Sequence, residues 1–335
     1  MIKKIIIGLL VVAVIALAGW RLFFSGSSTS EAFKDVDKNL TSYHMEATMD
    51  IENGEETRNY FVTTDYLKGE EVDNYRVSLY DKNINQEQIL LRNDKGVFVL
   101  TPTLNQVYHF KGDWPLNTPK PYLYQSMLES LKGEHEIKKM DDGYILSYKP
   151  NYANAPTWVK EDIKFSKDIK PLWINIYNAE NEAIVKIIFS KVEFDTTYDA
   201  NFFEVSNNME KARDGMEQSS SATINDLPLY PAGADVSAVL KEETSVVING
   251  EGAYILVYEG VNSFTIVQSI VEPTIEMVVH EIAGELVELN IGFGYVIDNY
   301  LTYHYNGVRY QIYSNNMTVA QMIEVANGME VVAMK

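Results

Sequence analysis

The sequence predicts an α+β protein rich in β-strand, with one large, strongly curved antiparallel sheet followed by a small α+β domain. Three observations support this fold class. The 335 residues include 22 Tyr and 13 Phe, which suit pleated, half-buried strands. Many segments alternate apolar and polar residues, as strands with one buried face do. Turns rich in Asn, Asp and Gly separate these segments. Because 46% of the residues are hydrophobic, the chain can also bury a sizeable core.

The first 24 residues predict a transmembrane anchor. Residues 5–19 carry no charge, and the apolar run reaches the roughly 20 residues of a membrane-spanning helix if Arg21 extends to the interface. Lys3 and Lys4 predict a cytoplasmic N-terminus, with the following domains outside the cytoplasm at the cell membrane. A cleaved signal segment is the alternative, because residues 16–18 have a small-x-small pattern. The bulky residues that follow this pattern favour the retained anchor.

Four further segments are expected after the anchor. Residues 25–30 are Ser, Gly and Thr and predict a short flexible tether. Residues 31–206 form the β-rich domain, residues 207–222 a polar linker, and residues 223–335 the small α+β domain.

In the β-rich domain, a helix is expected over residues 31–40, with Phe33, Val36 and Leu40 on one face. From Tyr43 to Ile51 the apolar period changes to two, which predicts a strand with one buried face. A second helix is expected near residues 122–131. Further strands are expected over 57–64, 75–80, 88–92, 97–100, 107–110, 135–140, 144–148, 159–165, 172–177 and 183–194.

In the small domain, strands are expected over residues 253–258 and 264–269. Asn306-Gly307 between residues 301–305 and 308–313 is the strongest hairpin signal in the chain. Thr318 and Gln321 have the spacing of a capping box, which predicts a final helix that stops at Gly328.

Charge and cysteine content exclude several classes of function. The net charge is −19, and the three cationic residues of the first 24 leave −22 for the rest, a surface that repels phosphate backbones and anionic headgroups. We therefore expect no nucleic-acid binding. The absence of cysteine excludes disulfides, thiolate catalysis and cysteine–zinc sites.

No residue pattern predicts an enzyme, a metal site or a bound cofactor. His280-Glu281 begins like a zinc-binding helix motif, but Gly284 stands where the second histidine would be. The five histidines are scattered, and no Gly-x-Ser-x-Gly turn occurs. We expect neither catalytic residues nor metal ligands.

Two passages resemble the lipoprotein-carrier (LolA-type) family, part of a LolA-like and RseB-like superfamily. Residues 88–110, QILLRNDKGVFVLTPTLNQVYHF, resemble its strand, turn and strand followed by a Pro-containing turn. Residues 163–205 resemble its C-terminal signature, with a turn ending in Pro171, a strand ending in Phe189 and a closing Phe202-Phe203. The resemblance covers roughly residues 40–206. Residues 223–335 resemble, more weakly, a small domain attached to such proteins in Gram-positive bacteria.

The resemblance implies a half-open antiparallel barrel, covered by helices, around an apolar cavity. Relatives carry lipid-modified proteins in that cavity or act as sensors and partners at envelope and sporulation membranes. A tethered chain cannot shuttle as the soluble carriers do, which favours local binding or regulation.

Eight residues are candidates for lining such a cavity, because apolar side chains on one face of a curved sheet suit an apolar ligand. The thioether side chains of Met45 and Met49 are flexible and polarisable, so they also suit irregular, lipid-like ligands. These residues either line a cavity or form an ordinary core, and both alternatives remain open. The loop residue Trp114 either closes the mouth of a cavity or simply packs against the protein. The candidates are Met45, Met49, Phe98, Trp114, Trp173, Val185, Ile187 and Phe189.

The sequence therefore predicts a membrane-tethered extracytoplasmic protein that binds an acyl chain, a lipid or a lipidated protein in a half-barrel. The alternative is a non-enzymatic interaction or regulatory protein of the envelope, sporulation or germination machinery, with a protein partner at the membrane and no small-molecule ligand.

Overall fold

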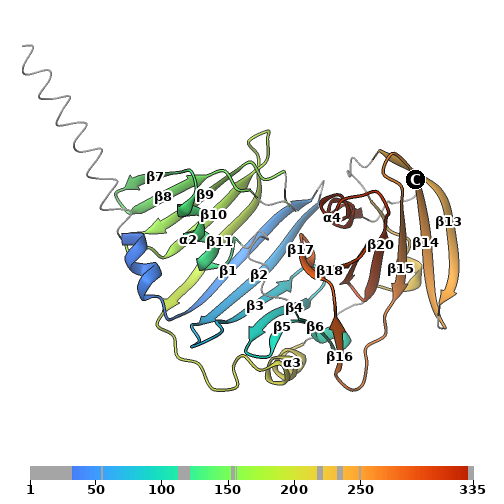
Figure 1. Ribbon diagram of the computed structural model, residues 1–335, viewed down its shortest axis with the longest axis horizontal. Helices are drawn as coiled ribbons and strands as arrows, with labels where there is room; N and C mark the ends of the chain where they lie inside the picture. The colour runs from blue at the N-terminus through green and yellow to red at the C-terminus, as the bar shows by residue number, and fades with distance from the viewer. Residues whose placement is uncertain are drawn as a thin grey trace, which may run out of the picture.

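The computed structural model describes residues 32–53, 56–111, 121–151, 155, 157–216, 222–231, 237–248 and 250–330. Most of these residues lie in two sheets that stand side by side, and every strand pair in them is antiparallel except β16 with β6 (Figure 1). The predicted anchor, the tether and Trp114 lie outside the described residues. Within them, no helix has the length and apolar content needed to cross a bilayer.

The larger sheet has twelve described strands, in the order β16-β6-β5-β4-β3-β2-β1-β11-β10-β9-β8-β7. The alternation predicted for residues 43–51 is present in its longest strands, and the sheet is twisted and curved (Figure 1). The strands are β1 (Ser42–Asn53), β2 (Glu56–Leu67), β3 (Asn74–Asp81), β4 (Gln86–Asn93), β5 (Gly96–Thr101), β6 (Gln106–Phe110), β7 (His135–Met140), β8 (Gly143–Tyr148), β9 (Lys160–Ser166), β10 (Pro171–Tyr177), β11 (Ala183–Phe194) and β16 (Val278–Ile282).

The smaller sheet has seven described strands, in the order β13-β14-β15-β20-β19-β18-β17. The turn between β19 and β20 is the predicted hairpin, since Asn306 and Gly307 both have positive φ, at 51° and 76°. The strands are β13 (Ala238–Ile248), β14 (Glu251–Gly260), β15 (Phe264–Ile270), β17 (Glu285–Leu289), β18 (Gly292–Ile297), β19 (Tyr300–Tyr305) and β20 (Val308–Tyr313). A two-stranded ladder of β12 (Tyr230–Pro231) and β21 (Met329–Glu330) lies beside it.

Few helices accompany the sheets. Residues 32–39 are helical, as expected, and the helix predicted near residues 122–131 is shorter, as α2 (Tyr124–Glu129) followed by the single turn η2 (Ser130–Lys132). Thr318 and Gln321 cap α4 (Val319–Asn327) reciprocally, as predicted. The remaining helical segments are η1 (Pro102–Leu104), α3 (Val205–Asp214) and η3 (Ile224–Asp226).

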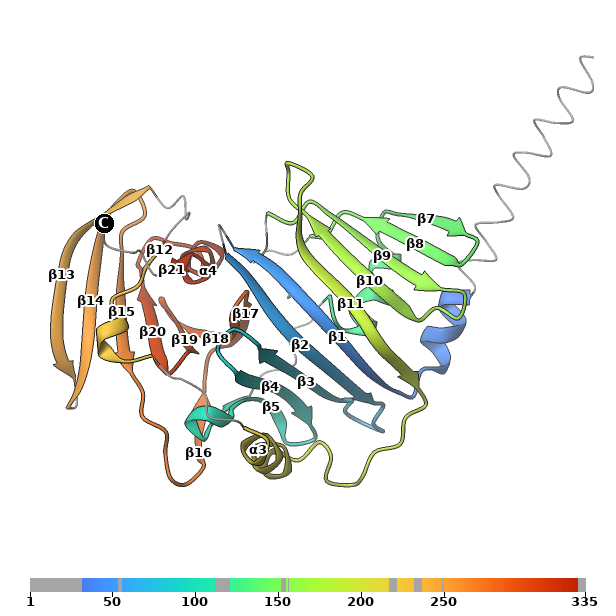
Figure 2. The same cartoon turned by 180° about the vertical axis from the view of Figure 1, so that it is seen from behind.

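Two features differ from the sequence-based expectation. The polar stretch expected as a linker begins inside α3, which packs Met209 against the outer face of the larger sheet beside β4 and β5 (Figure 2). In addition, β16 comes from the segment assigned to the small domain but pairs in parallel with β6 of the larger sheet. Because β16 completes that sheet, the two parts of the chain are joined by a backbone ladder as well as by side chains.

A paired substitution on β11 tests which face of the larger sheet is buried. Ile187 is 0% exposed and its neighbour Ile188 is 61% exposed. We expect Ile187→Ala to lower the free energy of unfolding by about 2–5 kcal/mol, because it removes buried methyl groups and leaves a cavity. Ile188→Ala should change it by no more than about 0.5 kcal/mol. Urea denaturation of both variants measures this, and equal losses would contradict the assigned faces.

Candidate functional site: the inner face and the junction between the sheets

The inner face of the larger sheet carries the main hydrophobic core. Odd-numbered residues of β1, from Tyr43 to Ile51, point to this face together with the inward residues of its neighbouring strands. Met45, Met49, Val185 and Ile187 are between 0% and 4% exposed. Burial this deep means that the chain's own atoms occupy the space in front of these side chains.

The residues that cover the inner face come from three places in the sequence. Phe33 of the N-terminal helix meets Phe165 edge to face, with the ring centroids 5.1 Å apart. The segment around α2 is fixed by hydrogen bonds from the Tyr43 hydroxyl to Gln125 Oε1, 2.6 Å, and from the Tyr124 hydroxyl to the Ile169 carbonyl, 2.8 Å.

The third contribution comes from the smaller sheet, whose Leu286 and Phe293 join the same core. The Tyr122 hydroxyl also donates a hydrogen bond to Glu288 of β17. The smaller sheet therefore closes one end of the inner face of the larger one.

The structure brings five of the eight predicted residues together. Met45, Met49, Val185 and Ile187 belong to the inner core, and the half-buried Phe189 packs against it.

Two others lie on the opposite face. Phe98 packs in the cluster under α3 and stacks on His109. Trp173 pairs with the exposed Ile188, while its neighbour Ile174 points inward. A ligand-contacting role for these residues stays a prediction.

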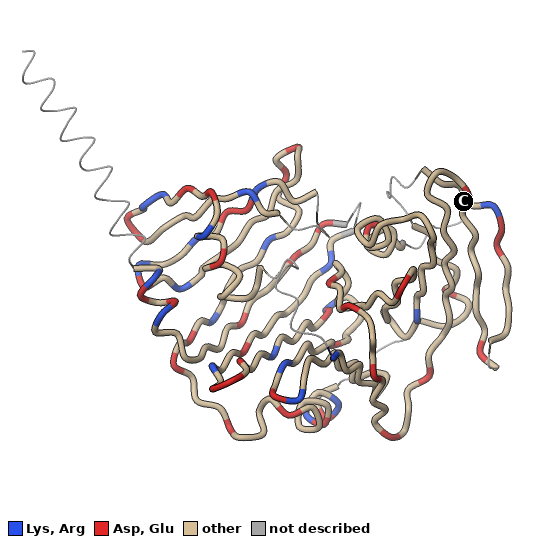
Figure 3. Tube along the Cα trace, viewed as in Figure 1, with Lys and Arg blue, Asp and Glu red and all other residues tan. Residues whose placement is uncertain are grey.

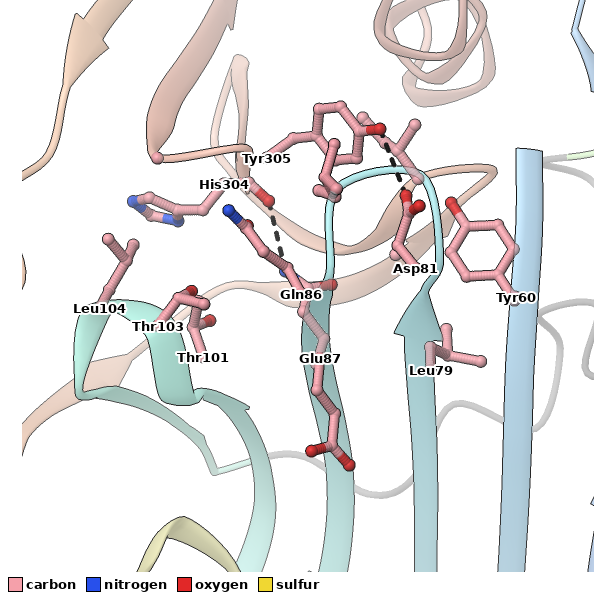
Figure 4. Close-up of a pocket in the computed structure, with 15 residues that line it drawn as sticks. Tyr60, Leu79, Asp81, Gln86, Glu87, Thr101, Thr103, Leu104, His304 and Tyr305 are labelled. Atoms are coloured by element: carbon pink, nitrogen blue, oxygen red, sulfur yellow. Dashed lines mark hydrogen bonds between the residues drawn. The ribbon is translucent and has the colours of Figure 1, made fainter. Parts of the chain in front are cut away.

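The junction between the two sheets was not singled out by the sequence, and it is rich in polar contacts. Gln88 of β4 donates from Nε2 to the His304 carbonyl, 3.2 Å, and accepts at Oε1 from the Phe293 amide, 2.9 Å. The Tyr60 hydroxyl donates to the Asn290 carbonyl, 2.8 Å. The Tyr305 hydroxyl lies 3.2 Å from Asp81 Oδ2, as Figure 4 shows. Each contact crosses from the larger to the smaller sheet, so their partners come from distant parts of the sequence.

A pocket lies within this junction (Figure 4). The empty space between its lining residues is about 410 Å3, a volume that includes open solvent. The Gln86 Nε2 and Thr101 Oγ1 atoms line it, and neither has a hydrogen-bond partner among the described residues. Burial lowers the pKa of His304 to about 3, with Arg309 contributing, so this imidazole is neutral at neutral pH. The contacts that cross the junction are mostly hydrogen bonds between the two sheets, so they suit packing between two parts of the chain.

A polar cluster lies on the outer face of the larger sheet. The His44 imidazole stands between Asp65, 2.7 Å from Nδ1, and Glu46, 3.0 Å from Nε2. Tyr198 and Arg76 also contact Asp65, at 3.2 and 3.6 Å. The hydrogen bond to Asp65 raises the pKa of His44 and that to Glu46 adds to it, while partial burial opposes both.

The described residues include several His, Asp and Glu side chains whose surroundings bear on bond-breaking chemistry. No group of three His, Asp or Glu side chains among them is arranged to hold a metal ion. The His280 ring stacks on Tyr108 and Glu281 pairs with His109, 2.8 Å, so the two residues of the partial zinc motif point to different partners. Burial raises the pKa of Glu161 to about 7. Its neighbours on the ladder are Ile176 and Tyr148, and a hydrogen bond with Tyr148 partly offsets this rise in pKa.

Comparison with known proteins gives one relative over nearly the whole chain. No family model matches the sequence. The chain is 28% identical over 326 residues to the sporulation protein YdcC of Bacillus subtilis (strain 168), covering 96% of this chain and 95% of that protein.

Similar solved structures include LolA-superfamily and MucB proteins. MucB in complex with MucA(peri) matches at 9% identity over 92% of this chain and 99% of that one, with a TM-score of 0.31. The LolA superfamily protein NE2245 from Nitrosomonas europaea matches at 10% identity over 52% of this chain and 96% of its own, with a TM-score of 0.29. Since both scores lie below 0.5, the function of this chain has to be argued from its own contacts.

Replacing Gln88 tests how strongly the junction holds the sheets together. Gln88→Leu leaves the His304 carbonyl and the Phe293 amide without these partners, so we expect a loss of about 1–3 kcal/mol in the free energy of unfolding. Amide hydrogen exchange should rise in β18 and β19 and stay unchanged in β10 and β11, which serve as the internal control. Unchanged exchange in β18 would show that Gln88 does not hold the junction.

The pH dependence of stability tests the His44 cluster. Because the folded-state pKa of His44 is raised, its stabilising effect is fully present below the unfolded-state pKa of about 6.5 and is lost as pH rises through the folded-state value. We expect the urea midpoint of the unmodified chain to fall over that window relative to the midpoint of His44→Gln. Parallel pH profiles of the two proteins would exclude a contribution from this imidazole.

Proposed function

We propose that this chain is a non-enzymatic interaction protein of the cell envelope or sporulation machinery, which works outside the cytoplasm and is tethered to the membrane by residues 1–24. Its partner is a protein, and the inner face of its larger sheet acts as a structural core. One observation carries this proposal: the side chains expected to contact an apolar ligand are at most 4% exposed at Met45, Met49, Val185 and Ile187.

The packing of the inner face favours a protein partner over an acyl chain. Ligand pockets are usually largely preformed. An acyl chain that reached Met45 or Ile187 would have to displace packed groups such as the segment around Tyr124. That segment is held by the hydrogen bond to the Ile169 carbonyl and by edge-to-face contact with Phe194, at 5.1 Å between ring centroids. Each acyl CH₂ gains only ~0.8 kcal/mol on burial, part of which replaces contacts that the protein already makes.

The full-length similarity to a protein named for sporulation supports a role in that process. The acidic surface is also suited to a protein that stays soluble and selective beside an anionic membrane, since it repels anionic headgroups.

Native mass spectrometry of the full chain, extracted from membranes in mild detergent, separates the protein-partner proposal from the lipid-binding alternative. We expect the mass of the chain without a lipid adduct, and crosslinking in cells should yield a defined protein complex. A stoichiometric lipid that survives extraction and is lost in Met45→Trp, but kept in the outer-face control Ile188→Trp, would overturn the proposal in favour of lipid binding.

A further inference from the structure

The edge strand β16 leaves one side of its backbone unpaired among the described strands. β16 is the last strand of the larger sheet and pairs on its other side with β6. The Val278 amide donates to the Asn105 carbonyl, 3.1 Å, so the backbone groups of Val278 and His280 face β6. Because these groups alternate along a strand, the N–H and C=O of Val279 and Glu281 face the open side. An edge of this kind is a template for the addition of another strand.

Three apolar side chains stand next to this open edge. Ile275, Met277 and Val279 are 97%, 40% and 48% exposed; Val279 lies in β16, Met277 directly precedes it, and Ile275 lies in the bend that leads into it. Val279 lies beside Val107 of β6, whose side chain is buried under the α3 cluster. Val279 therefore continues the apolar packing of the α3 cluster outward to the edge of the sheet, with the exposed Met277 and Ile275 preceding it in the chain.

Hydrogen bonds hold the segment that leads into β16 in place. The Thr274 amide and hydroxyl donate to the Leu104 carbonyl, at 3.1 and 3.2 Å. Asn105 Nδ2 donates to the carbonyls of Thr274 and Ile275, at 3.1 and 3.0 Å. Ile275 is thus displayed on an ordered backbone, which reduces the entropy lost when a partner binds to it.

The charge of this region indicates the kind of segment it would accept. Between residues 242 and 308 the sequence has ten Asp or Glu and no Lys or Arg. Glu272, Glu276 and Glu281 flank the apolar residues and are exposed, and Glu281 also pairs with His109. In Figure 3 the chain between β15 and β16 carries acidic residues and no basic ones. An acidic surface attracts a cationic segment and repels an acidic one.

We propose that β16 and its flanking residues Ile275 and Met277 form a docking edge for an extended, cationic segment of a partner protein. The segment adds as a strand to the open side of β16 and places alternate apolar side chains on Met277 and Val279, while its Lys or Arg residues meet the flanking glutamates. This inference rests on the proposed function, since it names the surface through which the protein partner binds.

Crosslinking in cells identifies the segment. A photo-crosslinking residue replaces Ile275 in the full chain, and the matched control replaces Val261, which is 77% exposed in the smaller sheet's β14–β15 turn. We expect a defined product at position 275 that is absent at 261, joined to a partner segment with at least two Lys or Arg and alternating apolar residues. The absence of a product specific to 275, or a product with an acidic segment, overturns the docking edge.

Titration of the synthetic peptide of that segment against purified full-chain variants then tests strand addition. Val279→Pro removes the outward N–H at a position where edge strands tolerate proline, and Val279→Thr keeps both the N–H and the β-branched shape. We expect Val279→Pro to weaken binding at least tenfold relative to Val279→Thr, and added salt to weaken binding to both. Equal affinities would overturn strand addition. If a protein complex still forms in cells through another surface, the docking edge fails while the proposed function stands.

Discussion

Burial of the apolar inner face of the twelve-stranded sheet is the constraint on which the rest of the structure depends. A sheet this wide and curved cannot leave that face to water, because about 25 cal/mol is lost for each Å2 of apolar surface that stays exposed. The chain covers it with Phe33, with the segment around α2, and with Leu286 and Phe293 of the smaller sheet. The smaller sheet therefore covers apolar surface that the larger sheet would otherwise expose to water.

The same constraint explains why the junction is polar around an apolar centre. Where the two sheets meet, backbone groups at the strands and turns of the smaller sheet need partners. Gln88 bridges two of these groups, and Tyr60 and Tyr305 supply further hydrogen bonds. β16 then extends the larger sheet by backbone pairing. A protein built in this way can present its outer edges and faces to a partner while its interior stays closed.

Sequence patterns could predict the local structure. The alternation from Tyr43 to Ile51 predicted β1, Asn306-Gly307 predicted the last hairpin, and Thr318 with Gln321 predicted the start of α4. The sequence did not predict β13, because the charged residues Lys241, Glu242 and Glu243 interrupt the apolar alternation of this exposed edge strand. The sequence did not predict α3 either, because residues 205–214 are mostly polar and Met209 is the main apolar residue that the helix buries.

Long-range placement could not be predicted in the same way. No local pattern indicates that residues 278–282 pair with residues 106–110, or that Gln88 meets His304. Phe98 lies on the outer face, and the sequence could not indicate this because β5 is buried on both faces, so alternation carries no information there. For Trp173 the signal was present, since Ile174 and Ile176 alternate with the more polar Asn175 and mark the opposite face as the inner one.

Thiol accessibility tests the closed inner face most directly, because the chain has no cysteine of its own and single introduced thiols report without background. Met45→Cys places a thiol on the inner face, and Ile188→Cys places one on the outer face. A closed interior predicts that a small maleimide labels position 188 rapidly and position 45 at least a hundredfold more slowly under native conditions. Comparable labelling rates at the two positions would contradict the account.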